Sequence, residues 1–150
     1  MKQLIVALGL SAFALGAAIN VDVYSGKDLQ ALSHKLLQKR TQFAGQELER
    51  YGNHYTMLAL RTATGSSEIH EHEADVFIIE SGQATLITGG KIVNPHTEKP
   101  GEIRGTSIEG GDRHPVAEGD IMHIPAKTPH QLVIENGKPF TYFVVKVTGQ

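Results

Sequence analysis

Apolar and polar residues follow three different patterns along the chain, and the first covers the N-terminal residues. Residues 4–19 are apolar apart from Ser11; they follow Lys2, and the small residues 16–18 stand near their end. A charged start, a short apolar stretch and small residues at its end are typical of a secretory signal peptide. We therefore expect residues 1–19 to be a cleaved signal peptide and the mature chain to be secreted or periplasmic. The alternative is a retained membrane anchor, although a membrane-spanning helix needs ~20 residues.

The second pattern is helical and covers residues 25–44. Ser25 can cap the first turn together with Asp28, and one apolar stripe contains Leu29, Leu32, Leu36 and Phe43. Lysines and arginines take the opposite face, and Gly45 is suited to end the helix. We expect a helix that packs on the outside of the domain, within an N-terminal extension of residues 20–53.

The third pattern is the alternation of strands, and it begins at His54. Glycine-containing turns at 81–82, 89–90 and 136–137 separate short apolar segments. The expected strands are 54–62, 69–72, 76–80, 84–88, 120–124, 131–135 and 140–147. Seven short strands without an intervening helix predict an all-β sandwich or barrel over residues 54–150.

Residues 94–119 do not alternate. They carry three prolines, several glycines and many charges. We expect a long loop, with a small hairpin around 101–111, that could cover the mouth of a barrel.

Composition narrows the chemistry. The 150 residues suit one domain, and a formal net charge of −2 gives no support for nonspecific nucleic-acid binding. The absence of cysteine excludes disulfides, thiol nucleophiles, iron–sulfur clusters and cysteine-based zinc sites. Six of the eight histidines fall between His70 and His130.

Three of these histidines and a carboxylate form a candidate metal-binding set. His70 and His72 would point to the same face of a strand, Asp75 follows closely, and His130 begins a later strand. Imidazole and carboxylate are ligands of manganese, iron, nickel, cobalt and zinc, and two histidines with one carboxylate are typical of non-haem iron. The other histidines, His34, His54, His96, His114 and His123, have no such surroundings.

Two stretches of the sequence resemble the motifs of the cupin superfamily. In the first, Gly65, His70, His72, Asp75 and Gly82 stand nearly in register, with one residue missing before His70 and an aspartate where the family has glutamate. In the second, Gly119, Pro125 and His130 match, whereas Lys127 replaces a glycine and Ile134 an asparagine. The resemblance implies a single cupin jelly-roll barrel, a double-stranded β-helix, with the helix as an accessory.

The resemblance also implies the metal ligands. His70, His72 and His130 match the three histidine ligands, and Asp75 aligns with the carboxylate ligand. Alternatively, Glu73 takes the place of Asp75, or three histidines bind the ion with additional water. The cofactor would be one divalent transition metal, Mn, Fe, Ni, Co or Zn.

We expect an exported metal-dependent enzyme that acts on a small organic molecule bound at an open metal position. A dioxygenase-like oxidoreductase is favoured over an isomerase or lyase, and the alternative is a non-catalytic cupin that binds or senses a small ligand. The pocket walls would include Met57, Phe77, Ile79, Leu132, Ile134, Phe140 and Tyr142, with Tyr55, Arg61 and Gln131 as polar groups that orient the substrate. A homodimer is also expected, with no nucleic-acid partner and with membrane contact only through the export segment.

Overall fold

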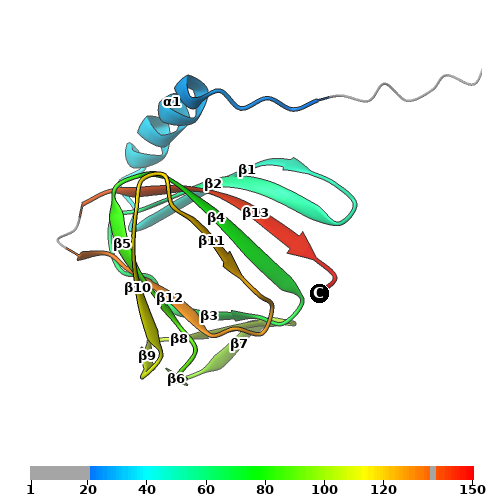
Figure 1. The fold of residues 1–150 in the computed structure, drawn as a ribbon, viewed down its shortest axis with the longest axis vertical. Coiled ribbons are helices and arrows are strands. Elements are labelled where there is room, and N and C mark those ends of the chain that lie inside the picture. Colours follow the sequence, from blue (N-terminus) through cyan, green and yellow to red (C-terminus); the bar gives the residue numbers. More distant parts are fainter. Residues whose placement is uncertain (1–20, 136–137) are drawn as a thin grey trace, which may run out of the picture.

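The structure is a computed structural model that describes residues 21–135 and 138–150. Within these residues the chain forms one α-helix and thirteen strands in a five-stranded, a six-stranded and a two-stranded sheet. The two large sheets curve into a barrel with the helix on the outside (Figure 1). This confirms the predicted all-β barrel with an accessory helix. The predicted signal peptide, residues 1–19, lies outside the described residues, and so does the predicted turn at 136–137.

The five-stranded sheet has the order β1-β2-β13-β4-β11, and the six-stranded sheet has the order β10-β5-β12-β3-β8-β7. Strands β6 and β9 form the small sheet, and every pairing among the described strands is antiparallel. The elements are α1 (Gly26–Leu37), β1 (Phe43–Arg50), β2 (His54–Arg61), β3 (Ser67–His70), β4 (Glu73–Ser81), β5 (Gln83–Thr88), β6 (Lys91–Val93), β7 (His96–Lys99), β8 (Glu102–Gly105), β9 (Ser107–Glu109), β10 (Asp112–Ala117), β11 (Ile121–Ile124), β12 (His130–Val133) and β13 (Phe140–Thr148).

Helix α1 starts as predicted but ends earlier. The Ser25 side chain accepts a hydrogen bond from the backbone N–H of Asp28 at 3.2 Å, which caps the first turn. The helix ends at Leu37, so the predicted extension to residue 44 is wrong, and Phe43–Arg50 is strand β1. Most side chains of β1 are exposed or half-buried, so the strand lacks the apolar alternation that would reveal it. The helix packs on the outer face of the five-stranded sheet, in a cluster of Leu29, Leu32, Leu36, Ala44, Leu58, Leu60 and Phe143.

The segment 94–119 is not the predicted loop, because it contains strands β7 to β10. Strand β7 is an exposed edge strand, and β10 is an edge strand that pairs only with β5 and carries Pro115. Edge strands tolerate proline and polar side chains, so their sequences lack the apolar pattern of central strands. The β7–β8 hairpin turns at Gly101, whose φ of 80° favours glycine.

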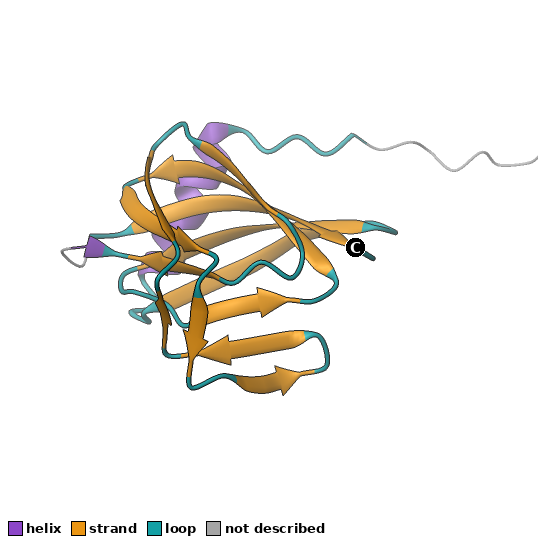
Figure 2. Cartoon of the chain, turned by 60° about the horizontal axis from the view of Figure 1, so that its bottom comes forward, coloured by secondary structure: helices purple, strands orange, loops and turns teal. Residues whose placement is uncertain are grey.

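The barrel interior is divided between an apolar core and the cavity described below. Figure 2 shows the strands of the two layers curving toward each other, with α1 behind one of them. The core residues are Ala59, Phe77, Ile79, Ala84, Leu86, Val116, Ile124, Leu132, Ile134, Phe140, Tyr142 and Val144. In the described part of the chain, no helix is long and apolar enough to cross a membrane.

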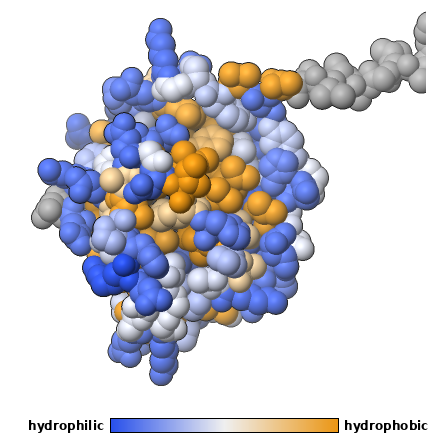
Figure 3. Space-filling model, viewed as in Figure 1, coloured by the Kyte–Doolittle hydropathy of each residue, from blue (hydrophilic) through white to orange (hydrophobic). Residues whose placement is uncertain are grey.

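Apolar side chains also reach the surface where α1 does not cover the five-stranded sheet. Figure 3 shows them gathered near the centre of the view, over β4 and β11, and Ile121 of β11 is 69% exposed. The predicted homodimer stays a prediction.

Candidate metal centre

A cavity of about 620 Å³ opens between the two large sheets. Alternate residues of several strands turn into it, because side chains of a strand point to opposite faces in turn. Strands β2, β4 and β13 of the five-stranded sheet contribute Tyr55, Met57, Ala59, Arg61, Glu73, Asp75, Phe77, Tyr142, Val144 and Lys146. Strands β3, β7, β8 and β12 of the six-stranded sheet contribute Glu68, His70, His96, Glu98, Lys99, Glu102, Arg104, His130 and Leu132.

Two buried histidines lie side by side on the neighbouring strands β3 and β12, with ring centroids 5.2 Å apart. His70 Nδ1 lies 2.8 Å from both carboxylate oxygens of Glu102, and His130 Nδ1 lies 3.0 Å from the carbonyl oxygen of Thr128. These contacts fix the orientation of both rings and leave each Nε2 directed at the cavity, as in metal-ligating histidines.

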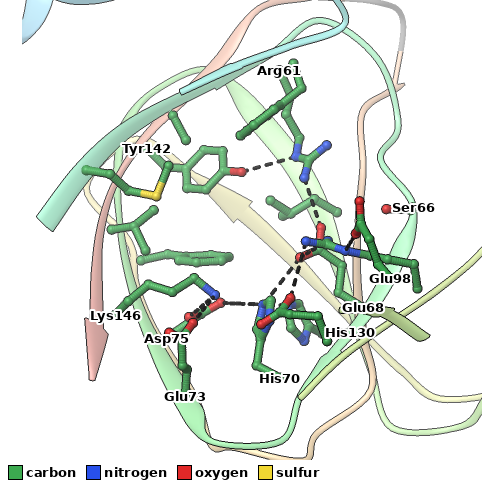
Figure 4. Close-up of a pocket in the computed structure, with 18 of the residues that line it drawn as sticks. Arg61, Ser66, Glu68, His70, Glu73, Asp75, Glu98, His130, Tyr142 and Lys146 are labelled. Carbon is green, nitrogen blue, oxygen red and sulfur yellow. Dashed lines mark hydrogen bonds and ion pairs between the residues drawn. The ribbon is translucent and has the colours of Figure 1, made fainter. Parts of the chain in front are cut away.

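Two carboxylates approach the Nε2 atoms. The Oδ2 of Asp75, from β4, lies 3.4 Å from His70 Nε2 and 3.8 Å from His130 Nε2. The Oε2 of Glu68 lies 3.3 Å from His70 Nε2, and Glu68, His70 and His130 offer ligand atoms within 4.8 Å of one another. Figure 4 shows His70, His130 and Asp75 at the end of the cavity away from Arg61, with Glu68 between them and Arg61.

The structure places His72 outside this group. Strand β3 ends at His70, and His72 lies in the bend before β4, where it is exposed and does not line the cavity. Because the strand does not continue through His72, the two-residue spacing that would align it with His70 is lost. Glu68 stands two residues before His70 on the same strand, so its side chain points to the same face. It was not among the predicted metal ligands.

Glu73, the predicted alternative to Asp75, also lines the cavity. It lies 3.6 Å from Lys146 Nζ and accepts a hydrogen bond of 3.4 Å from the Tyr55 hydroxyl. His70, Glu73 and Glu102 also form a group whose ligand atoms lie within 4.8 Å of one another. Since Glu102 holds the Nδ1 of His70, we assign Glu102 to orienting that ring.

Of the residues expected in the pocket walls, those that line the cavity are Met57, Phe77, Leu132, Tyr142, Tyr55 and Arg61. Ile79, Ile134 and Phe140 belong to the core, and Gln131 donates to the carbonyl oxygen of Gly65 at 2.8 Å. Of the histidines set aside, His96 lines the cavity, whereas His114 and His123 line a separate cavity of about 280 Å³.

Three cations form ion pairs with the carboxylates of the cavity. Lys146 Nζ lies 2.8 Å from Asp75 Oδ1, and Arg61 Nη2 donates to Glu68 Oε1 at 3.1 Å. Arg104 contacts Glu68 as well, and it also pairs with Glu98 at 2.8 Å and Glu102 at 3.4 Å. None of these cations was predicted next to the metal ligands. Lys146 follows Tyr142 and Val144 at a spacing of two residues, so its side chain points to the same inward face, and this spacing could have revealed it.

These surroundings shift the pKa values of the four donor residues. Burial lowers the pKa of His130, which favours the neutral imidazole that binds metals. Burial also acts to lower the pKa of His70, but the adjacent carboxylates of Asp75 and Glu68 raise it to about 9. Burial acts to raise the pKa of both carboxyls, but His70 and the neighbouring cations hold them below their usual range.

The chemistry of the donor set fits a divalent transition metal. His70 Nε2 is buried and makes no hydrogen bond within the described residues, and it stands beside a second imidazole and two ionised carboxylates. Two imidazole nitrogens and two carboxylate oxygens are the ligand types of manganese, iron, nickel, cobalt and zinc.

Comparisons with known proteins agree with the fold. No family model and no curated protein matches the chain in sequence. A conserved protein with a double-stranded β-helix domain from Klebsiella pneumoniae superposes with a TM-score of 0.59 at 14% identity, over 87% of this chain and 93% of that one.

Two further structures carry the family name. The cupin domain of Cnp3 from Schizosaccharomyces pombe has a TM-score of 0.55 at 8% identity, over 72% of this chain and 66% of that one. A sugar phosphate isomerase of the cupin superfamily from Silicibacter pomeroyi has a TM-score of 0.50 at 17% identity, over 71% and 59%. At such identities the similarity establishes the fold, so the chain has the double-stranded β-helix barrel of the cupins that its sequence motifs predicted.

Proposed function

We propose that this protein is a metal-dependent enzyme that acts on a small organic molecule inside the barrel. His70, His130 and Asp75 would hold one divalent transition metal, with Glu68 as a fourth donor. The observation that carries the proposal is the approach of Asp75 Oδ2 to both buried Nε2 atoms, at 3.4 and 3.8 Å, inside a cavity large enough for a ligand.

A dioxygenase-like oxidation is the reaction that this donor set supports best. With His72 outside the site, His70, His130 and Asp75 form the two-histidine, one-carboxylate combination of non-haem iron oxygenases, and Glu68 would be a fourth donor beside them. The bound metal would supply a Lewis acid for substrate oxygen atoms and, if redox-active, electron transfer to dioxygen. The apolar walls, including Phe77, Leu132 and Val144, would hold the carbon skeleton and limit the entry of water.

Metal analysis of three matched variants tests the ligand assignment. The wild-type chain purified without added metal is expected to contain about one transition-metal ion per chain. His70→Ala and His130→Ala should lose the ion, whereas His72→Ala should keep it, because its side chain is exposed outside the cavity. A metal-free wild type would contradict the proposed function, and loss of metal in His72→Ala would contradict the assignment of ligands.

A second candidate is a non-catalytic cupin that holds a small ligand. The observation that favours it is that every carboxylate lining the cavity has an ion-pair partner among Arg61, Arg104 and Lys146 without a metal. Oxygen consumption measured with a panel of catechols and diketones separates the candidates. Turnover supports the enzyme, whereas a bound ligand without turnover supports the binding protein.

The export of the chain rests on the sequence pattern of residues 1–19. We propose that the mature protein acts outside the cytoplasm. Mass spectrometry of the protein recovered from cell fractions would test this, since a cleaved chain in the periplasm or medium is expected. Full-length protein in the cytoplasm would contradict it.

A further inference from the structure

Arg61 is the least compensated of the three cations that pair with carboxylates in the cavity. Its side chain is 13% exposed, and within the described residues its one ion-pair partner is Glu68, which Arg104 contacts too. Lys146 contacts two carboxylates and Arg104 contacts three. Because Arg61 shares the Glu68 carboxylate with Arg104, part of its positive charge is not compensated. Some of its N–H groups can therefore bind a ligand.

The guanidinium of Arg61 is held in one orientation. Its Nε donates to the Tyr142 hydroxyl at 3.1 Å, and its Cζ lies 4.7 Å from the centre of the Phe43 ring. Gly65 packs against it so closely that a Cβ there would lie 2.3 Å from Arg61 Nη1. The hydrogen bonds to Tyr142 and Glu68 use two of the five N–H groups of a guanidinium.

The Tyr142 hydroxyl adds a second donor at the same place. It accepts the hydrogen bond from Arg61, so its own proton is free to be donated to another acceptor. Burial raises the pKa of Tyr142, which keeps this proton in place at neutral pH. Figure 4 shows the Tyr142 ring reaching across the cavity toward Arg61. The two side chains together form a cradle for an oxyanion.

The net charge of the cavity also favours an anionic ligand once a metal is bound. Five carboxylates and four lysines or arginines line it, so its formal charge is −1 with neutral histidines. A divalent ion changes this charge to +1, and a ligand with one negative charge would neutralise it. Binding of the metal and of such an anion should therefore strengthen each other.

Arg61 lies close to the metal donors, because the Glu68 carboxylate contacts both. Its Oε1 lies 3.1 Å from Arg61 Nη2 and its Oε2 lies 3.3 Å from His70 Nε2. A ligand of a few atoms can therefore reach both Arg61 and the metal. We infer that the substrate is a small organic acid: Arg61 and the Tyr142 hydroxyl bind its carboxylate, and a second oxygen atom of the same molecule reaches the metal. This inference rests on the proposed function.

Titration calorimetry with matched acids and amides tests the inference. The probes are salicylate with salicylamide and 2-oxobutanoate with 2-oxobutanamide, titrated into wild-type protein with and without zinc. Both acids should bind the zinc form about 10- to 100-fold more tightly than their amides, which is the effect of one charge-assisted hydrogen bond. Arg61→Met should abolish this preference, Tyr142→Phe should reduce it while keeping the ring, and Arg61→Lys should retain part of it.

The exposed Arg113, which lies 3.9 Å from Glu135, provides the control, because Arg113→Met removes a charge outside the cavity. Equal affinity for acids and amides, or an acid preference that survives Arg61→Met, would overturn the inference even if the metal is bound. A wild type that binds no metal but prefers acids through Arg61 would overturn the proposed function and leave the anion cradle standing.

Discussion

The ion pair of Asp75 and Lys146 allows a quantitative test of the site. The side chains are 2% and 12% exposed, and Lys146 Nζ lies 2.8 Å from Asp75 Oδ1. Asp75→Asn keeps the shape of the side chain but removes its charge. Losing one partner of a buried ion pair costs about 3–5 kcal/mol in free energy of unfolding. Lys146 keeps Glu73 at 3.6 Å, so we expect a cost near the lower end, about 3 kcal/mol.

Thermal and urea unfolding of metal-free protein at pH 7 would measure this cost. A loss of about 3 kcal/mol corresponds to a fall in Tm of about 6–12 °C for a chain of this size. The double variant Asp75→Asn/Lys146→Met removes both charges and should recover most of the loss. Glu135→Gln, at the exposed Arg113 pair, is the control and should change nothing measurable. If the double variant is no more stable than Asp75→Asn, the ion-pair explanation is refuted.

Three more predictions concern the surroundings of His70, and a fourth concerns the turn at Gly82. Glu102→Gln should weaken metal binding about 10- to 100-fold by loosening His70 Nδ1, as measured by competition with a chelator. Because neighbouring carboxylates overcome burial and raise the pKa of His70 to about 9, metal binding at pH 7 should release about one proton, detectable by calorimetry in buffers of different ionisation enthalpy. The same shift means that the metal-free protein loses stability as the pH rises from about 6.5 through 9, and an unchanged urea midpoint would contradict it. Gly82→Ala should destabilise the fold by at least about 1–2 kcal/mol, because φ is +87° and the new Cβ would lie 2.4 Å from the carbonyl oxygen of Pro139. Gly52→Ala, where nothing lies within 4 Å, is its control in urea unfolding.

The pattern of short strands in the sequence predicted an all-β sandwich or barrel, and the cupin-like motifs selected the barrel and part of the cavity wall. Strands β2, β4 and β13 each contain a run of apolar residues, because one face lines the core or cavity and, on β2 and β13, the other face packs against α1. Because side chains of a strand point to opposite faces in turn, Asp75, Phe77 and Tyr142 lie on inward faces. Strands β1 and β7 are edge strands with mostly exposed side chains, and no hydrophobic signal marks them.

The site itself was only partly predictable, because motif spacing does not show where a strand ends. His70, Asp75 and His130 lie together, but the bend after His70 carries His72 out of the cavity. Glu102 and Arg104 lie in the segment predicted as a loop, so no sequence pattern places them beside His70. Their position depends on the pairing of β8 with β3, which is a long-range contact.

The donors of the metal centre come from both layers of the barrel, since His70 and His130 lie in one large sheet and Asp75 lies in the other. The donor set is therefore complete only when the two layers have closed on each other. An ion held there would be selected from those present in the compartment where the barrel closes. Once bound, it would fasten one layer to the other, so its removal should lower the barrier to opening the barrel.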